Sequence, residues 1–330
     1  MQKLLAVFVL PLLVASCGGS AASSSSPDTP ADKSAAASDD NVAKGPISFV
    51  FAWKMPCRVP VEQVETKKGH TVRLRYMLSA KPGPEGNIDV DLGDFEFLEM
   101  DGQDLTTPKM QAELAPALAL TTMMPTMVVS PEGDYVRVRG LEALVDRVVA
   151  HMGKGMDKQK KAKLATMMRS PRILQMVQAK SGDYWNGWVG AWTGLELAAS
   201  ASREGDDVMD VGGVEIPVRL RYENHGPVKG TPGFYRVSLS STMAGNSAST
   251  GVLALMRSIL QDAGSDMPTD VQVDHVSIVN KVEVVTEPAT LLPHRARRER
   301  TMELVMAGDR KKRVEVREET FDWKHAEGCR

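Results

Sequence analysis

Apolar and polar residues alternate over long stretches of the chain, and this period of two predicts β-strands with one wet face. In 72–79 the Val, Leu and Tyr side chains occupy even-numbered positions. In 88–97 the apolar set changes from even-numbered positions to Phe95 and Phe97. We therefore expect a β-bulge near Gly93, because one extra residue must be absorbed to keep the apolar side chains on one face.

A hairpin is expected over 128–138. Its turn would lie at 130–133, where Pro131 and Gly133 occupy the positions that a type I turn favours. The alternation on both sides of this turn predicts two short paired strands.

The C-terminal part of the chain predicts a meander of three strands. These are 271–285, 291–306 and 311–323. A three-residue turn at 308–310 would set Leu304 opposite Val314 and Met302 opposite Val316. This register would place all four apolar side chains on one face of the sheet.

Between 141 and 180 the period becomes helical. Ser170 is expected to cap a helix whose first residue is Pro171. A further helix is expected over 251–261. The resulting fold class is α+β: a large twisted antiparallel sheet, either an incomplete barrel or two similar halves, with a few helices packed on one face.

The sequence Val-Arg-Leu-Arg-Tyr occurs twice, at 72–76 and 218–222. The recurrence indicates either a duplication, with halves of about 46–140 and 205–330 around the helical block 141–180, or chance repetition of a half-buried strand pattern. Both interpretations predict equivalent roles for the two strands.

The N-terminus has the pattern of a signal peptide, with Lys3 ahead of an apolar stretch, 4–14, too short to span a bilayer. The stretch ends in Val14-Ala15-Ser16-Cys17, which resembles the lipobox of bacterial lipoprotein precursors. The resemblance implies that 1–16 is removed, that the sulfur of Cys17 carries diacylglycerol, and that the new amine carries a fatty acyl group such as palmitate. The alternative is an ordinary secretory signal cleaved near Ala22.

Small and polar residues dominate 18–40, which would span roughly 25 Å as a flexible coil. The segment 17–45 is therefore expected to be a disordered tether ahead of a folded body at 46–330. The lipobox resemblance implies a bacterial cell-envelope protein facing the periplasm or the exterior. In the enterobacterial form of the family an Asp after the lipidated Cys retains the protein in the inner membrane. Gly18 stands there in this chain, which favours the outer membrane.

The predicted body is similar to envelope lipoproteins of the incomplete-barrel type, which resemble lipoprotein-localisation carriers and hold acyl chains between a sheet and helices. The similarity implies a lipid or other apolar ligand beneath the helices. Six residues are candidates for its lining: Trp185, Trp188, Trp192, Met123, Met124 and Met127. The alternatives are core packing for both groups and, for the tryptophans, insertion at a membrane or partner surface.

Cys57 and Cys329 are the cysteines that remain once Cys17 is acylated. Outside the inner membrane the compartment permits disulfides, so these two either form a bridge or stay as thiols. Because no CxxC spacing is present, the bridge would stabilise the fold and not catalyse redox chemistry.

The charge balance is close to neutral, with 40 basic and 42 acidic residues, which gives no electrostatic reason to expect nucleic acid as a partner. One local excess of positive charge lies in the helical block. Its lysines are Lys154, Lys158, Lys160, Lys161 and Lys163. They form either a solvated helix face or a patch that docks on anionic lipid or on another envelope protein.

Motifs for catalysis, for cofactors and for metals are missing from the sequence. The histidines have no ligand spacing, and the acidic residues Asp89, Asp91 and Asp94 are typical of a wet strand face and not of a Ca²⁺ loop. We therefore expect a non-catalytic binding module. A structural or assembly lipoprotein is the second hypothesis, and an envelope hydrolase with a triad assembled from distant positions is the third.

Overall fold

The structure, a computed structural model, describes residues 45–121, 124–210, 214–262, 273–306 and 308–329. The predicted signal peptide, Cys17, nearly all of the tether and Met123 lie outside the described residues. Most of the body is one antiparallel sheet of twelve strands that does not close into a barrel. The predicted fold class, α+β with a large antiparallel sheet, is confirmed.

The twelve-stranded sheet has the order β7-β6-β4-β3-β2-β14-β13-β12-β11-β10-β9, and β5 pairs with β4. Its strands are β2 (Cys57–Lys67), β3 (His70–Pro82), β4 (Ile88–Met100), β5 (Gln103–Asp104), β6 (Thr126–Val129), β7 (Tyr135–Arg139), β9 (Ser202–Asp210), β10 (Glu215–Pro227), β11 (Tyr235–Ala244), β12 (Val273–Thr286), β13 (Pro293–Met306) and β14 (Asp309–Phe321). A separate pair is formed by β1 (Pro46–Ser48) and β8 (Glu196–Ala198).

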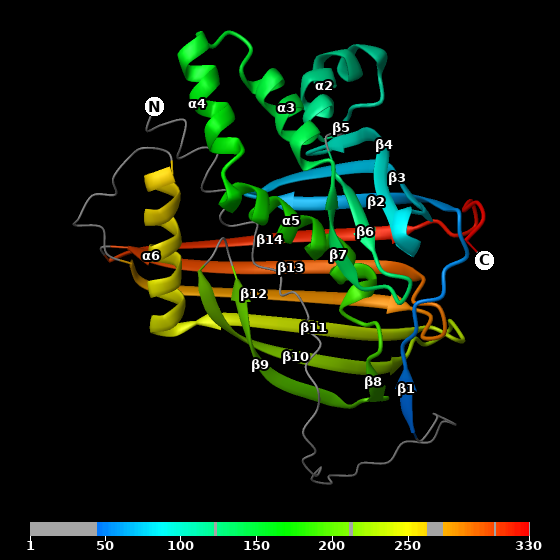
Figure 1. The fold of residues 1–330 in the computed structure, drawn as a ribbon. Helices are drawn as coiled ribbons and strands as arrows, with labels where there is room; N and C mark the ends of the chain where they lie inside the picture. The colour runs from blue at the N-terminus through cyan, green and yellow to red at the C-terminus, as the bar shows by residue number, and fades with distance from the viewer. Residues whose placement is uncertain (1–44, 122–123, 211–213, 263–272, 307, 330) are drawn as a thin grey trace.

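The helices lie around this sheet. They are α2 (Pro108–Thr121), α3 (Leu141–Met152), α4 (Lys158–Met168), α5 (Pro171–Trp185) and α6 (Gly245–Asp262), with a 3₁₀ turn η1 (Pro84–Gly86) and a π turn η2 (Asn186–Gly190). In Figure 1, α5 crosses the front of the sheet and α6 stands at one end of the strands. At the top of the same view, α2, α3 and α4 gather beyond β3 and β4.

Two apolar clusters fill the space between the sheet and the helices. The larger contains the buried tryptophans and residues such as Val237, Val284 and Ala296. The smaller lies under α6 and the start of α5 and contains Met243 and Ile278. Because β11 and β12 supply residues to both clusters, the clusters lie at opposite ends of the same strands, and the middle of those strands is left for polar side chains.

The bulge expected in β4 is present. Arg75 pairs with Glu96 and Met77 pairs with Gly93, so two residues of β4 lie opposite Tyr76 alone. Asp94, inside the bulge, has a φ of 52°, the left-handed region that few residues other than Gly, Asn and Asp adopt readily. The hairpin predicted over 128–138 is also present, as β6 and β7.

The register predicted for the C-terminal hairpin is wrong. Leu304 lies opposite Lys311 and Met302 opposite Arg313, because Met306 pairs with Asp309 in a tighter turn at Gly308, where φ is 79°. The observed partner of Leu304 is three positions from the expected one. Because three is an odd number, the side chains of β14 that were expected on the inner face lie on the outer face, and the reverse. Val314 is exposed, while Glu315 and Arg317 of β14 line a cavity under α5.

The two copies of Val-Arg-Leu-Arg-Tyr occupy β3 and β10 of the same sheet and have equivalent roles. In each copy the arginines lie on the outer face and pair with acidic residues of a neighbouring strand. The ion pairs are Arg73–Glu62, Arg75–Glu96, Arg219–Asp206 and Arg221–Glu204. Leu74 and Tyr76 are buried on the inner face, where Leu220 and Tyr222 also lie.

The helix start predicted at Ser170 is confirmed, because its Oγ accepts a hydrogen bond from the backbone N of Ile173 at 3.4 Å and Pro171 is the first residue of α5. The helix expected over 251–261 is α6, which begins earlier, at Gly245. Sequence patterns did not predict α2, although Thr107-Pro108 repeats the signal of a capping side chain before a proline.

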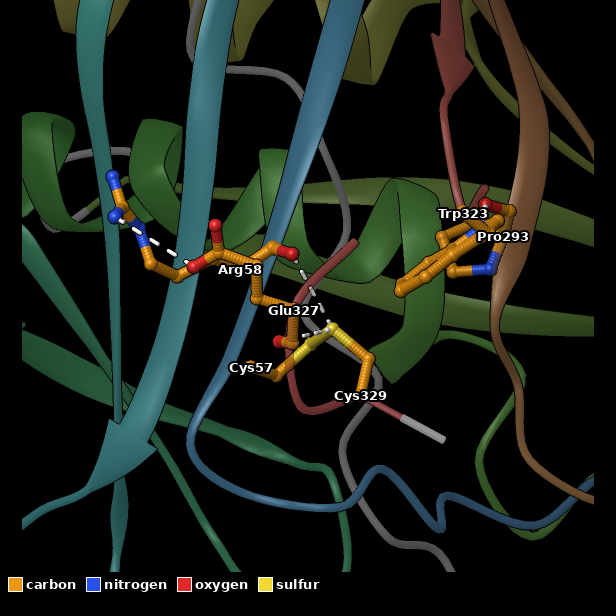
Figure 2. Close-up of a disulfide and its surroundings, with 6 residues drawn as sticks. All are labelled: Cys57, Arg58, Pro293, Trp323, Glu327 and Cys329. Carbon is orange, nitrogen blue, oxygen red and sulfur yellow. Dashed lines mark hydrogen bonds and ion pairs between the residues drawn. A yellow bond between two sulfur atoms is a disulfide. The ribbon is translucent and has the colours of Figure 1, made fainter. Parts of the chain in front are cut away.

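Cys57 and Cys329 form a disulfide with a Cα–Cα distance of 4.5 Å (Figure 2). The chain after β14 folds back beside β2, where the backbone N of Arg58 donates to the carbonyl of Glu327 at 2.9 Å and the reverse bond is 2.8 Å. Trp323 donates its Nε1 hydrogen to the carbonyl of Pro293 at 2.7 Å. The C-terminal segment is therefore fixed to two strands of the sheet.

β9 forms one edge of the large sheet, next to β10 alone among the described strands. It presents acidic side chains, among them Glu204, Asp206 and Asp207.

None of the helices in the described part of the chain combines the length and the apolar content needed to cross a bilayer.

Candidate functional site

A cavity of about 80 Å³ lies between the sheet and the segment formed by α5 and η2. Its floor comes from six neighbouring strands, β10, β11, β12, β13, β14 and β2, and its roof from residues between Lys180 and Ala191. A buried water needs roughly 10–15 Å³ in this measure, so the cavity has room for several waters or part of a small organic molecule.

The lining of the cavity changes from apolar to charged across the sheet. On β10 and β11 it presents Leu220, Tyr222 and Leu239. Ser241 of β11 and Asn280 of β12 come next. The lining from β13, β14 and β2 is mainly charged: Arg298, Arg300, Glu315, Arg317 and Glu65. One end of the cavity therefore suits an apolar group and the other suits a charged one.

Arg300 is the most unusual of these residues because it is 7% exposed and its Nε and Nη2 atoms are buried with no hydrogen-bond partner in the described structure. Arg298 donates to the backbone carbonyl of Asp183. Among the described residues, neither arginine has a carboxylate within ion-pair distance. Because an unpaired ion costs several kcal/mol to bury, these two cations need a partner.

The remaining charges of the cavity are largely paired with one another. Arg317 contacts Glu65 at 3.3 Å between Nη2 and Oε2. Glu315 Oε1 lies 2.5 Å from Nη2 of Arg313 and 3.4 Å from Nζ of Lys67. The carboxylates of Glu65 and Glu315 are thus neutralised by neighbouring cations. The positive charge of Arg298 and Arg300 is therefore in excess.

Tyr184 of α5 lies among three of the cations. The guanidinium carbon of Arg317 is 4.6 Å from the centre of its ring, Nζ of Lys180 is 5.6 Å away, and the guanidinium carbon of Arg298 is 5.9 Å away. Cations above an aromatic face are attracted by its quadrupole, so the ring holds the positive side chains at the edge of the cavity.

Gly187 in η2 allows the helix to approach Arg298. A Cβ added at this glycine would lie 2.2 Å from Nη2 of Arg298, closer than any real contact. A side chain at this position would therefore displace the guanidinium of Arg298 from where it lies in the cavity.

Two ionisable side chains of α5 have shifted pKa values. Burial lowers the pKa of Lys180 from 10.5 to about 7, with a further lowering from Arg317. Burial also raises the pKa of Asp183, although Lys180 and Arg298 act in the opposite direction. Each shift favours the uncharged form of the side chain.

Replacing Lys180 with Met is expected to remove part of the pH dependence of stability. Between pH 7.5 and 9.5 the unfolded chain keeps a proton on Lys180 that the folded protein releases, so the free energy of unfolding of the natural chain should rise with pH relative to the variant. The limit is about 1.4 kcal/mol per pH unit. Urea unfolding at several pH values across this range measures the difference. Lys163→Met controls for the loss of one lysine. If the free energy of unfolding depends on pH in the same way in the natural chain and in Lys180→Met, the lowered pKa of Lys180 is contradicted.

The tryptophans predicted to line a ligand site are core residues. Trp185, Trp188 and Trp192 are 0%, 1% and 0% exposed. They come from the end of α5, from η2 and from the turn after it, so the segment is helical despite its glycines. Met127 is buried and Met124 packs against the same cluster. The cavity is lined by residues between these tryptophans: Asn186, Gly187 and Ala191.

The three aspartates of β4 each contact a cation. Asp89 pairs with Arg139 at 2.6 Å, Asp91 with Lys81 at 3.1 Å and Asp94 with Arg58 at 3.3 Å. Within the described residues, no group of three or more His, Cys, Asp or Glu side chains could hold a metal ion.

The lysines of the helical block lie on and beside α4, a helix with no buried residue. Lys160 contacts Asp157, the N-cap of the helix, at 2.8 Å. The side chains of Lys158, Lys161 and Lys163 are exposed. The patch is thus presented to solvent on a helix that projects from the body in Figure 1.

The charged floor of the cavity was not predicted. A pattern did exist, because polar residues occupy alternate positions in the strands that supply it: Arg298 and Arg300 in β13, Arg313, Glu315 and Arg317 in β14, and Gln63 and Glu65 in β2. Alternate positions share a face. With the correct register, three neighbouring strands would have placed these side chains together.

The fold and the site define an α+β protein in which an open antiparallel sheet holds a helix over a partly charged cavity. No family model matches the chain, and no curated protein matches it. Among solved structures, one described as "Lipid-protein interactions in lipovitellin" matches with a TM-score of 0.37 and 10% identity. The match covers 86% of this chain and 26% of that chain. At this TM-score the similarity carries no argument about ligand or function.

Proposed function

We propose that the protein is a bacterial cell-envelope lipoprotein, held at the outer membrane by acyl chains on Cys17, whose body is a non-catalytic binding module. The binding site is the cavity under α5 and η2. The observation that carries this proposal is the cavity itself, which occupies the gap between two well-packed apolar clusters and contains a buried arginine with unused hydrogen-bond donors.

The chemistry of the cavity supports binding more than catalysis. Its polar side chains, among the described residues, are three arginines, two glutamates in ion pairs, Asp183, one lysine, one serine, one tyrosine and two asparagines. Ser241 accepts a hydrogen bond from Asn280 at 3.2 Å, and no histidine among the described residues lines the cavity. Fixed cations beside an apolar wall can hold a ligand in place, whereas a nucleophile needs an adjacent base to be activated.

The anchor rests on the lipobox of Val14 to Cys17. One acyl chain gives only marginal membrane binding, and each buried methylene adds about 0.8 kcal/mol, so the chains that lipoprotein processing attaches would hold the body permanently. A ligand taken from or delivered to a bilayer would then always be close to the cavity.

Mass spectrometry tests both parts of the proposal in one preparation. The protein is extracted from membranes with a mild non-ionic detergent and its mass is measured under denaturing and native conditions. We expect the denatured mass to equal residues 17–330 with the disulfide and acyl chains, and the native mass to be larger by one non-covalent ligand. Cys17→Ser is the control and should lose the acyl mass. A denatured mass without acyl chains would contradict the anchor.

Docking of α4 to an anionic surface is the second candidate function. It is favoured by the exposure of Lys158, Lys161 and Lys163 on a helix with no buried residue. Lysines near an anionic membrane contribute about 1 kcal/mol each, and the attraction is screened by salt. In the same extract, a native mass without a small ligand but with a second protein bound would favour this assembly function over the binding module.

A further inference from the structure

We propose that the ligand of the cavity is an amphipathic anion, whose carboxylate or phosphate group is held by Arg300 and Arg298 and whose apolar body lies against β10 and β11. This inference rests on the proposed function and names the class of ligand for the same site. It follows from the two ends of the cavity, each of which has its own evidence.

The head-group end is defined by hydrogen-bond donors that the protein does not use. Arg300 is more than nine-tenths buried, lines the cavity, and leaves Nε and Nη2 without a partner in the described structure. These two nitrogens belong to the planar fork with which arginine binds the two oxygens of a carboxylate or phosphate. Arg298, two residues earlier on the same face of β13, adds a second cation.

The acidic residues around the cavity do not neutralise this pair. Glu65 is held by Arg317, and Glu315 is held by Arg313 and Lys67. Asp183 contributes its backbone carbonyl to Arg298. Its carboxyl group is shifted towards the neutral form because burial raises its pKa. A cationic ligand would have to enter beside two unpaired arginines, so the charge of the site favours an anion.

The apolar end is defined by Leu220, Leu239 and Val282, with the ring of Tyr222 beside them. Leu239 and Val282 also pack against the larger apolar cluster. Ser241 and Asn280 lie between Leu220 and Arg300, and Val282 is directly opposite Arg298. An ion without an apolar body, such as inorganic phosphate, would leave these side chains facing water, whereas an alkyl or aromatic chain would cover them.

Calorimetric titration of the full chain in non-ionic detergent can separate the two ends of the ligand. The probes are octanoate, octyl phosphate, octan-1-ol and acetate. We expect one site, at which octanoate or octyl phosphate binds at least ten-fold more tightly than octan-1-ol or acetate. A preference for octanoate would indicate a fatty acid as the source of the anion, and a preference for octyl phosphate would indicate a phosphate-bearing lipid.

Variants on one strand supply the matched control. Arg300→Met should weaken binding of the preferred anion at least ten-fold, and Arg300→Lys should restore part of it. Arg297→Met removes a cation from the outer face of the same strand, where Arg297 pairs with Glu318 and Glu299, and should leave the affinity unchanged. Leu239→Asn tests the apolar end and should weaken octanoate while leaving acetate unchanged.

The outcomes distinguish this inference from the proposed function. Equal binding of octan-1-ol and octanoate, or an equal loss with Arg297→Met and Arg300→Met, would overturn the anion assignment and leave an apolar binding module. If no probe binds at millimolar concentration and no ligand copurifies, both the inference and the binding module are overturned.

Discussion

Replacing both Cys57 and Cys329 with alanine is expected to lower the free energy of unfolding by roughly 5 kcal/mol. The disulfide joins residues 272 positions apart, so it removes much of the conformational freedom of the unfolded chain. Since a domain is usually stable by about 5–15 kcal/mol, the loss is large enough to unfold a fraction of the protein at growth temperature.

Urea unfolding of the natural and double-alanine chains measures this effect. The native spectrum should change little, because Arg58 and Trp323 still hold the C-terminal segment by hydrogen bonds (Figure 2). The dependence of the free energy on urea should become steeper, because the unfolded state without the cross-link is more expanded. If the variant does not fold, the natural chain unfolded with and without a reductant gives the same comparison. An unchanged free energy of unfolding in water would show that the bridge contributes nothing.

Replacing Trp188 with alanine is expected to destabilise the fold by about 5 kcal/mol, of which 3–5 kcal/mol comes from the cavity left by a buried tryptophan. The rest comes from Glu319, which is 5% exposed and accepts a hydrogen bond from Nε1 of Trp188 at 2.6 Å. A buried carboxylate that loses its shortest donor costs a further amount. The hydroxyl of Tyr76, at 3.5 Å, is the other donor to this carboxylate.

Two conservative variants isolate the hydrogen bond from the packing. Trp188→Phe keeps most of the buried ring and should cost about 2 kcal/mol, because it removes the donor to Glu319. Trp192→Phe is the matched control, since Trp192 is equally buried but its Nε1 has no hydrogen-bond partner in the described structure. We expect it to change stability much less. Equal losses in the two phenylalanine variants, measured by urea unfolding, would mean that the bond to Glu319 has no stabilising role.

The sheet and its main helices could be predicted because their signals are local. Alternation over a single strand is enough to identify β3, and the change of parity between Ile88 and Phe97 is enough to locate the bulge in β4. Ser170 and Pro171 define the start of α5 because a helix cap is a contact between near neighbours. The pairing of Cys57 with Cys329 was one of two open alternatives, since spacing alone does not bring distant cysteines together.

The cavity could not be predicted because it depends on register between strands. The expected pairing of Leu304 with Val314 put valines on the inner face of β14, and the observed pairing with Lys311 puts Glu315 and Arg317 there. One turn at Gly308 decides between an apolar and a charged floor. The tryptophans left two interpretations open, because large buried side chains are typical of a core and of a ligand site alike.

The acidic side chains of the edge strand β9 affect how closely copies of the protein can approach one another. With the proposed anchor, many copies would share one membrane surface. The backbone groups on the edge of β9 that no described strand pairs could then join neighbouring molecules into a continuous sheet. Two such edges brought together would set Glu204, Asp206 and Asp207 of one copy against the same carboxylates of the next. Repulsion between like charges on adjacent strands opposes that pairing, so the protein can be abundant on a bilayer without polymerising.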